Sequence, residues 1–237
     1  MFASAEQQLI YRVANAVVSP YPFPHIYVED VFPKTFFERI REHLPPKQAF
    51  TPLGKLVQAP GNYVSTRHVI PLESPQLDAL DEPFRTFWRE TAAWLIAGRF
   101  PGLALHKFAT ELTQRFPDFN TREFRVEGSL IHDETNYHLL PHSDVPQKVL
   151  SFLFYLPADD RRSHLGTSIY VPLNPRFACD GGNHWDPSLF ERVATMPYKP
   201  NTLFAFVKTV QSFHGVERVD EPNVHRDLLF LDIKTQT

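Results

Sequence analysis

A series of short apolar segments in the second half of the chain places the strongest constraint on its fold. From Arg122 onward these segments are rich in Val, Ile, Leu, Phe and Tyr, and they read REFRVEGSLIH, KVLSFLFYLP, GTSIYVPL, NTLFAFVK and RDLLFLDI. Pro, Asn, Asp and Gly bound them, which is typical of β-strands joined by turns. No stretch between them carries a helical pattern long enough to link parallel strands. The pattern therefore predicts a mainly antiparallel double sheet, as in a sandwich or jelly roll.

The first half of the chain has mainly helical rather than strand-like patterns of apolar residues. Apolar residues recur at helical spacing over residues 33–44, 76–100 and 103–116, which predicts three α-helices. Residues 25–32 alternate apolar and polar side chains, as a half-buried strand does. The halves meet near residue 120 without a low-complexity linker. We therefore expect a single domain over residues 1–237, in which residues 1–120 give helical support with an opening strand and residues 121–237 form the β core.

Composition and charge exclude several classes of protein. The chain has 237 residues and a formal net charge of −3, so it lacks the cationic excess that an obligate nucleic-acid partner requires. Its single cysteine, Cys179, cannot form an internal disulfide or a thiolate zinc cage. The N-terminal residues lack the features of a secretory signal, and no apolar run is long enough to cross a membrane. We expect a cytoplasmic protein without a membrane partner.

Candidate metal-ligating residues lie just before the strongest predicted strand, in the sequence His142-Ser143-Asp144. On an extended segment the side chains at i and i+2 point to the same side, so His142 and Asp144 could bind one ion together. His214 is the other histidine just beyond an apolar strand and would supply a third ligand. Two imidazoles and one carboxylate form the facial triad of non-haem Fe(II) oxygenases. Motifs of serine hydrolases, P-loop kinases, dinucleotide-binding dehydrogenases and HExxH proteases are absent from the sequence.

Each of these three residues also has a structural interpretation. His142 and His214 could be polar residues at strand ends, and Asp144 could be a turn residue. Three further histidines are alternative ligands whose parity or context suits the site less well: His132, His138 and His225.

Arg226 strengthens the interpretation as a site. It follows His214 by twelve residues at the start of a predicted strand, where its guanidinium could reach inward and bind a carboxylate in a bidentate manner. The alternative is a structural ion pair with Asp220 or Glu221. His225 precedes Arg226 and should point to the opposite face of that strand.

In the order and spacing of His142, Asp144, His214 and Arg226, the sequence resembles the Fe(II)/2-oxoglutarate-dependent dioxygenases, and among them the prolyl-hydroxylase-like branch. The resemblance covers roughly residues 122–235, and residues 25–45 resemble the strand and helix that often precede this core. It implies a double-stranded β-helix, which is a jelly roll. The expected fold is therefore mainly β with N-terminal α-helices around a jelly-roll core.

The resemblance also implies roles for single residues. His142, Asp144 and His214 would be the metal ligands at the catalytic centre, and Arg226 would bind the distal carboxylate of 2-oxoglutarate. Tyr155 would hydrogen-bond that carboxylate, with Ser151 on the same strand face as the alternative. The implied cofactors are Fe(II) and 2-oxoglutarate as co-substrate, and dioxygen is the oxidant. The implied reaction is hydroxylation coupled to oxidative decarboxylation of 2-oxoglutarate to succinate. Asp144 favours hydroxylation, because a halogenating relative would carry a small residue there.

Some features depart from the family pattern. The usual Gly-Gly before the middle strand is Leu165-Gly166-Thr167 here, and the spacing between His214 and Arg226 is slightly long, so that the loop between them would absorb extra residues. Residues 174–197 are long enough to be a lid or a substrate-facing insertion. The substrate could be a small molecule or a peptide. Two other functions are a non-catalytic jelly-roll binding protein with a vacant metal site, and a cupin-like metal enzyme without 2-oxoglutarate, which Arg226 argues against.

Overall fold

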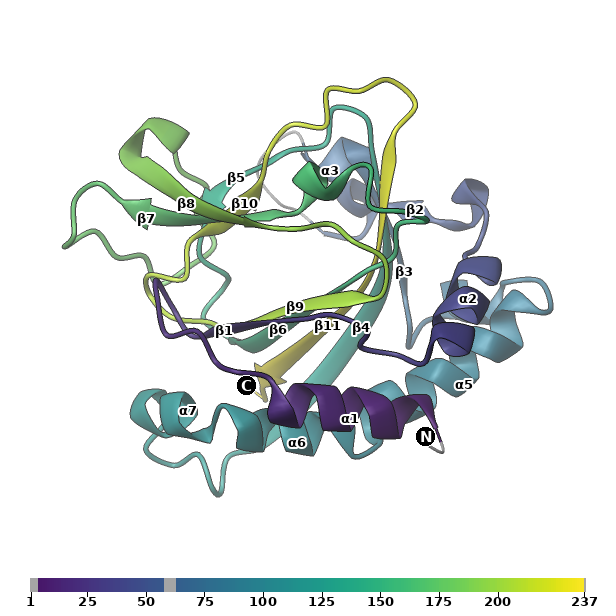
Figure 1. Cartoon of the computed structure of the whole chain (residues 1–237), viewed down its shortest axis with the longest axis horizontal. Helices are drawn as coiled ribbons and strands as arrows, with labels where there is room; N and C mark the ends of the chain where they lie inside the picture. Colours follow the sequence, from purple (N-terminus) through teal and green to yellow (C-terminus); the bar gives the residue numbers. More distant parts are fainter. Residues whose placement is uncertain (1–3, 58–62, 237) are drawn as a thin grey trace.

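Two antiparallel β-sheets face each other in the computed structural model, which describes residues 4–57 and 63–236 (Figure 1). The larger sheet has seven strands in the order β1-β9-β6-β11-β4-β3-β2, and the smaller has four in the order β5-β10-β7-β8. From β4 onward the chain passes repeatedly from one sheet to the other. This is the arrangement of a double-stranded β-helix, so the predicted mainly β, jelly-roll fold is confirmed.

The apolar segments that predicted strands form the long strands of the roll. They are β4 (Phe124–Glu134), β6 (Lys148–Tyr155), β7 (Thr167–Pro172), β9 (Thr202–Val207) and β11 (His225–Thr235). Three further strands complete it: β5 (Leu139–His142), β8 (Phe190–Met196) and β10 (His214–Val216). Most residues of β6 and all of β9 are buried, because the smaller sheet covers one face of these central strands and helices cover the other.

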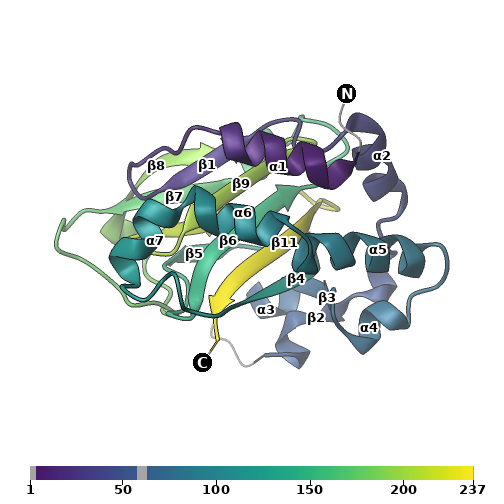
Figure 2. The ribbon, with the colours of Figure 1, turned by 90° about the horizontal axis from the view of Figure 1, so that it is seen from below.

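Several helices of the first half lie across the outer face of the larger sheet (Figure 2). On β6, Phe152 and Phe154 point outward to this layer, where the Phe152 ring lies 5.3 Å from Phe100 and the Phe154 ring stacks 5.3 Å from Phe32. Ser151 points into the roll, as strand alternation requires. The helices are α1 (Ala5–Asn15), α2 (Lys34–Glu42), α3 (Tyr63–Thr66), α4 (Pro75–Asp78), α5 (Phe84–Ala97), α6 (Phe100–Lys107) and α7 (Ala109–Arg115).

The helices agree with the predictions in outline, but their limits differ. The helix predicted over residues 33–44 is α2, whereas residues 76–100 form α4 and α5, which begins after Pro83. A helix cannot run through Pro83 unbroken, because proline lacks the backbone N–H and clashes with the preceding turn. The third predicted helix starts earlier, with Pro101 in its first turn, and is divided at Phe108. Helix α1 was not predicted.

The N-terminal half also contributes strands to the larger sheet. Strand β1 (His25–Val28), predicted as the opening strand, pairs with β9 at one edge. Strands β2 (Thr51–Pro52) and β3 (Arg67–Pro71) were not predicted, and β3 pairs with β4 at the other edge. The first half therefore extends the sheet at both edges in addition to giving helical support.

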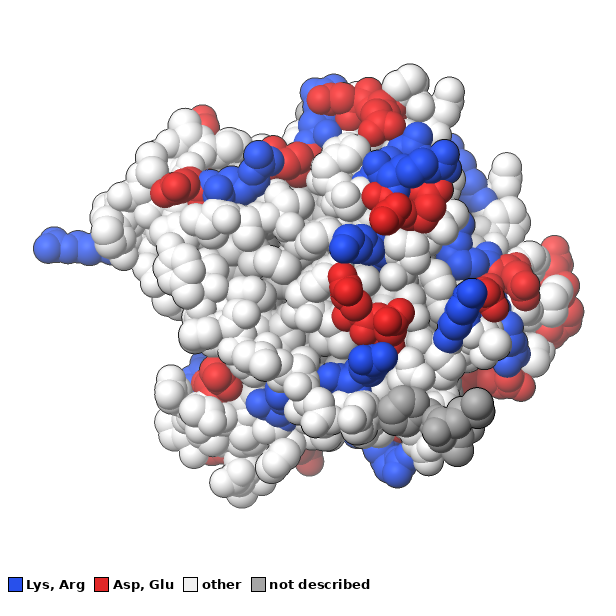
Figure 3. All heavy atoms as spheres, in the orientation of Figure 1, with Lys and Arg blue, Asp and Glu red and all other residues white. Residues whose placement is uncertain are grey.

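The surface carries charges of both signs. Acidic and basic side chains are interspersed on the face shown in Figure 3, as expected for a chain with 24 Lys and Arg and 27 Asp and Glu. No helix among the described residues combines the length and the apolar character that crossing a membrane requires.

Candidate metal centre

The fold brings His142, Asp144 and His214 together. His142 ends β5 and His214 begins β10, and the two residues are direct partners in the antiparallel pairing of these strands. Their rings lie 4.3 Å apart between centroids. One ligand atom from each of the three residues lies within 4.8 Å of the others, and all three residues are buried. The predicted set is therefore a compact group of two imidazoles and one carboxylate.

Backbone carbonyls orient both imidazoles. Nδ1 of His142 donates to the Leu140 carbonyl at 3.0 Å, and Nδ1 of His214 donates to the Ser212 carbonyl at 3.0 Å. A proton on Nδ1 leaves the lone pair on Nε2, the tautomer that a metal-binding histidine needs. Burial lowers the pKa of His142 and of His214, and the proximity of the two rings lowers that of His142 further. Both rings are thus held neutral and oriented for ligation.

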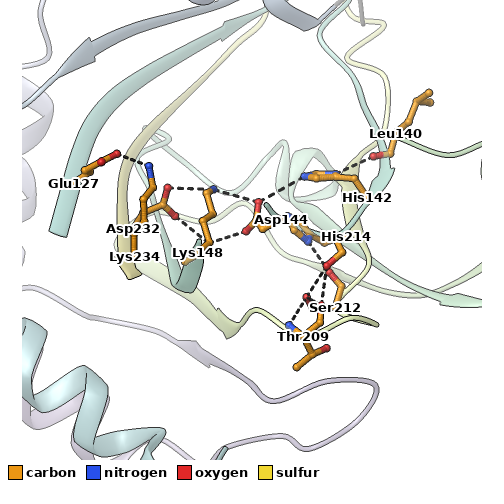
Figure 4. Close-up of polar contacts among 12 residues, drawn as sticks. Glu127, Leu140, His142, Asp144, Lys148, Thr209, Ser212, His214, Asp232 and Lys234 are labelled. Carbon is orange, nitrogen blue, oxygen red and sulfur yellow. Dashed lines mark hydrogen bonds and ion pairs between the residues drawn. The ribbon is translucent and has the colours of Figure 1, made fainter. Parts of the chain in front are cut away.

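Asp144 is held by neighbours on both of its oxygens (Figure 4). Ser151 Oγ donates to Oδ2 at 2.8 Å, and the Lys148 ammonium lies 3.2 Å from Oδ1. Oδ1 also lies 3.9 Å from Nε2 of His142. Burial by itself would raise the pKa of Asp144, but Lys148 and the two histidines lower it well below the usual value. The carboxylate is therefore charged, as a metal ligand must be.

The charged network continues across the inner face of the larger sheet (Figure 4). Lys148 lies 3.1 Å from Asp232, and Ser151 Oγ also contacts Asp232 at 3.0 Å. Lys234 is ion-paired with Glu127. Asp232 thus provides a second acceptor for the two groups that hold Asp144. Of these residues only Ser151 was considered from the sequence, because the others come together through strand register.

A large cavity opens at the triad. It has a volume of about 840 Å³, and His142 and Asp144 line it. Its apolar wall includes Leu53, Val69, Ile131, Leu139 and Phe230, and its charged wall includes Arg67, Glu127, Lys148, Asp232 and Lys234. The size is within the range of cavities that bind small organic ligands.

Part of the segment 174–197 packs against β5 and the residue that follows it. The Gly182 N–H donates to the Ser143 carbonyl at 3.1 Å, and the Trp185 N–H donates to the Pro141 carbonyl at 2.9 Å. The His184 ring lies 4.9 Å from that of His142, and His184 lines the cavity. The segment was predicted as a lid or a substrate-facing insertion. His184 was not singled out, although its surrounding sequence FACDGGNHWDP was.

Arg226 lies inside the roll at the start of β11, and its side chain is 1% exposed. Its Nη1 is 2.8 Å from Asp133 Oδ2, and its Nε donates to the Leu165 carbonyl at 2.5 Å. The suggested structural partners Asp220 and Glu221 are paired instead with other arginines. Nη2 of Arg226 is buried without a hydrogen-bond partner among the described residues.

A second guanidinium shares the carboxylate of Asp133. Arg67 on β3, Asp133 on β4 and Arg226 on β11 are register partners across three adjacent strands. Arg67 binds Asp133 through Nε at 2.7 Å and Nη2 at 2.9 Å. Tyr137 lies beneath both cations, with its ring centroid 4.6 Å from Arg67 Cζ and 5.7 Å from Arg226 Cζ. Asp133 is therefore shared between two guanidinium groups, of which Arg226 is fully buried and Arg67 is partly exposed.

Tyr155 and the three alternative histidines lie outside the triad of His142, Asp144 and His214. Tyr155 is buried on β6, and its hydroxyl donates to Thr167 Oγ1 at 2.8 Å. His138 is bonded through Nδ1 to the Asn136 carbonyl. His132 and His225 lie on the outer face of the larger sheet, where both contact Asp227. None of these three histidines joins the triad.

No protein-family model matches the sequence, and no curated protein matches it significantly. Solved structures are nevertheless similar in fold. The alpha-ketoglutarate-dependent carbocyclase SnoK from nogalamycin biosynthesis superposes with a TM-score of 0.52 at 14% identity, covering 98% of this chain and 86% of that one. A prolyl-4-hydroxylase from Pseudomonas putida gives a TM-score of 0.51 at 13% identity, covering 97% and 100%.

A prolyl hydroxylase from Trichoplax adhaerens, solved with a peptide of the hypoxia-inducible factor, gives a TM-score of 0.52 at 9% identity and covers 97% of this chain and 88% of that one. These likenesses extend over almost the whole chain, helices included. The chain therefore has the fold shared by this carbocyclase and these prolyl hydroxylases.

Proposed function

We propose that the chain is an Fe(II)/2-oxoglutarate-dependent oxygenase that hydroxylates an organic substrate. The observation that carries the proposal is the buried triad of His142, Asp144 and His214, whose ligand atoms lie within 4.8 Å of one another. Two neutral imidazoles and one carboxylate are the donor set that suits Fe(II) while leaving positions for a co-substrate and dioxygen. The fold supports the same class, since the similar structures include an alpha-ketoglutarate-dependent carbocyclase and a prolyl-4-hydroxylase.

The residues around Arg226 fit the co-substrate. Arg226 is buried, and a buried N–H group without an acceptor is unfavourable, so its surroundings favour binding of an anion. The unpartnered Nη2 of Arg226 offers a donor for it. The distal carboxylate of 2-oxoglutarate has the required charge and planar shape. Tyr155 is buried on β6 beside Leu228, which follows Arg226 by two residues on the same face of the sheet. It remains a proposed partner of that carboxylate.

When bound, iron and 2-oxoglutarate supply dioxygen activation coupled to decarboxylation, with succinate and carbon dioxide as products. The protein holds and insulates the reacting groups. The Leu140 and Ser212 carbonyls keep the protons of both imidazoles on Nδ1, and Ser151 fixes one oxygen of Asp144. The apolar wall of the cavity offers a surface against which an apolar part of the substrate could pack. The volume of about 840 Å³ admits a small molecule or a peptide side chain.

The test is anaerobic titration of the Fe(II)-loaded protein with 2-oxoglutarate, followed through visible charge-transfer absorbance. We expect a saturable band in the wild type, its loss in His142→Ala, and its retention in His138→Ala, which changes a half-buried histidine outside the triad. Succinate formation then gives an assay for substrates. If the wild type binds neither iron nor 2-oxoglutarate, the proposal fails, and the alternative of a non-catalytic jelly-roll binding protein is favoured.

A further inference from the structure

A second group of histidines and carboxylates lies on the outer face of the larger sheet. Side chains alternate along β11, so Arg226 points into the roll while His225 and Asp227 point outward. Asp227 is the register partner of His132 on β4. These three residues therefore lie on the face of the sheet opposite to the triad.

The three side chains are close enough to share one ion. His132 Nδ1 is 2.8 Å from Asp227 Oδ1, and His225 Nε2 is 3.3 Å from Asp227 Oδ2. The two imidazoles stack with centroids 4.9 Å apart. One ligand atom from each residue lies within 4.8 Å of the other two, and apart from the triad no other such group occurs among residues 4–57 and 63–236.

Further charged and polar groups border this outer cluster. Arg41 on α2 has its Nη1 3.6 Å from Asp227 Oδ2 and also donates to the Leu156 carbonyl. His68 is the next residue in the row, as register partner of His132. Its Nδ1 is buried without a hydrogen-bond partner among the described residues and lies 3.9 Å from Glu134 Oε2.

We propose that His132, His225 and Asp227 form a second metal site, which binds Zn²⁺ or a similar divalent transition-metal ion. Two imidazole nitrogens and one carboxylate oxygen are ligands that Zn²⁺ commonly takes in proteins, and a water molecule would complete a tetrahedral set. His225 is the accessible ligand, with 54% of its side chain exposed, so an ion can reach the site from solvent. A cavity of about 200 Å³, bordered by Arg41, Tyr198, His225 and Asp227, adjoins it.

Arg41 should oppose binding of the ion. Its guanidinium and a bound cation compete for the same carboxylate, since both are positive and both approach Asp227 Oδ2. Replacing Arg41 by glutamine removes the competing charge but keeps a side chain that can donate to Leu156. The affinity for the ion should therefore rise in Arg41→Gln and fall in His225→Ala.

The experiment uses the double variant His142→Ala/His214→Ala, in which the triad cannot bind metal. We expect titration with Zn²⁺ by calorimetry, and with Co²⁺ by visible absorbance, to show one bound ion. Adding His225→Ala should weaken binding at least tenfold, whereas adding Arg41→Gln should tighten it severalfold. His164→Ala is the matched control, because His164 is also an exposed histidine, 3.3 Å from the carboxylate of Glu221.

The wild type gives the same test without relying on the double variant. It should bind two ions, one of which is lost in His225→Ala and the other in His142→Ala. Absence of binding in a folded double variant, or binding that survives His225→Ala, would overturn the proposal and leave the cluster as a hydrogen-bonded ion-pair network. These outcomes do not depend on the proposed oxygenase activity, because the double variant lacks the triad.

Discussion

Arg226 and Asp133 form an ion pair that is sealed inside the jelly roll: Nη1 lies 2.8 Å from Oδ2, and the two side chains are 1% and 0% exposed. Asp133 is shared with Arg67, which binds both of its oxygens. One carboxylate is therefore shared by two guanidinium groups, and Arg226 lies on the same inner face of the sheet as Asp232 beside the triad.

Arg226→Lys should fold but bind 2-oxoglutarate at least tenfold more weakly. Lysine keeps the positive charge beside Asp133 but lacks the planar fork that binds a carboxylate through two hydrogen bonds. The measurement is the 2-oxoglutarate concentration that gives half of the charge-transfer absorbance. Arg218→Lys, at an exposed arginine paired with Asp220, is the control. Equal affinity in Arg226→Lys and the wild type would exclude Arg226 as the anchor of the co-substrate.

Ser151→Ala should lower the affinity for Fe(II) by about 10- to 100-fold, the usual effect of removing a group that orients a metal ligand. Ser151 Oγ is the donor that fixes Asp144 Oδ2 and links it to Asp232. The measurement is anaerobic Fe(II) titration. Ser168→Ala is the control, because Ser168 is equally buried but contacts Thr195 on β8. An unchanged Fe(II) affinity would show that Asp144 is oriented without Ser151.

Gly181→Ala should destabilise the fold by about 1–3 kcal/mol and weaken Fe(II) binding as well. Gly181 has a φ of +128°, and a Cβ there would lie 1.9 Å from the backbone oxygen of Asp144. The added methyl group would therefore displace either the segment 181–185 or the backbone at Asp144. Urea denaturation and Fe(II) titration measure the two effects.

The control for this variant is Gly102→Ala on α6, where a Cβ has no neighbour within 4 Å. Alanine has the higher helix propensity, so this change should leave stability unchanged or raise it by up to about 1 kcal/mol. A Gly181→Ala protein as stable as the control would show that the segment moves freely away from Asp144.

Lys208 should make stability rise with pH on the alkaline side. Burial and the neighbouring Arg115 lower the pKa of Lys208, whose side chain is 1% exposed and donates to the Asp180 carbonyl. In the unfolded chain the pKa returns to about 10.4. Between these two values the unfolded state binds more protons than the folded state, so the free energy of unfolding increases with pH.

The variant Lys208→Met should lack this pH-dependent contribution to the free energy of unfolding. Just below pH 10.4, the wild-type free energy of unfolding should rise more steeply with pH than that of Lys208→Met, by up to about 1.4 kcal/mol per pH unit. Lys34→Met, at a lysine with 89% of its side chain exposed, should have the wild-type slope. Parallel slopes for the wild type and Lys208→Met would refute the assignment.

Much of the architecture follows from local pattern. The strands β4, β6, β7, β9 and β11 contain enough apolar aliphatic and aromatic residues to be recognised one by one. Helix α2 is recognised by its helical spacing of apolar residues. Strands β2, β3, β5 and β10 are only two to five residues long, and their pairing with distant segments defines them. Pro83 and Phe108 divided two predicted helices, because apolar periodicity continues across a break that backbone geometry imposes.

At the site, the sequence by itself determined the pairing of His142 with Asp144, because residues two apart on an extended segment face the same way. It also pointed to His214 and Arg226 through order and spacing. Only the tertiary structure decided that His142 and His214 are strand partners, that Asp133 and Arg67 surround Arg226, and that His132, His225 and Asp227 meet on the outer face. These contacts depend on the register between strands far apart in the chain, which local periodicity leaves open and the packing of the whole roll selects.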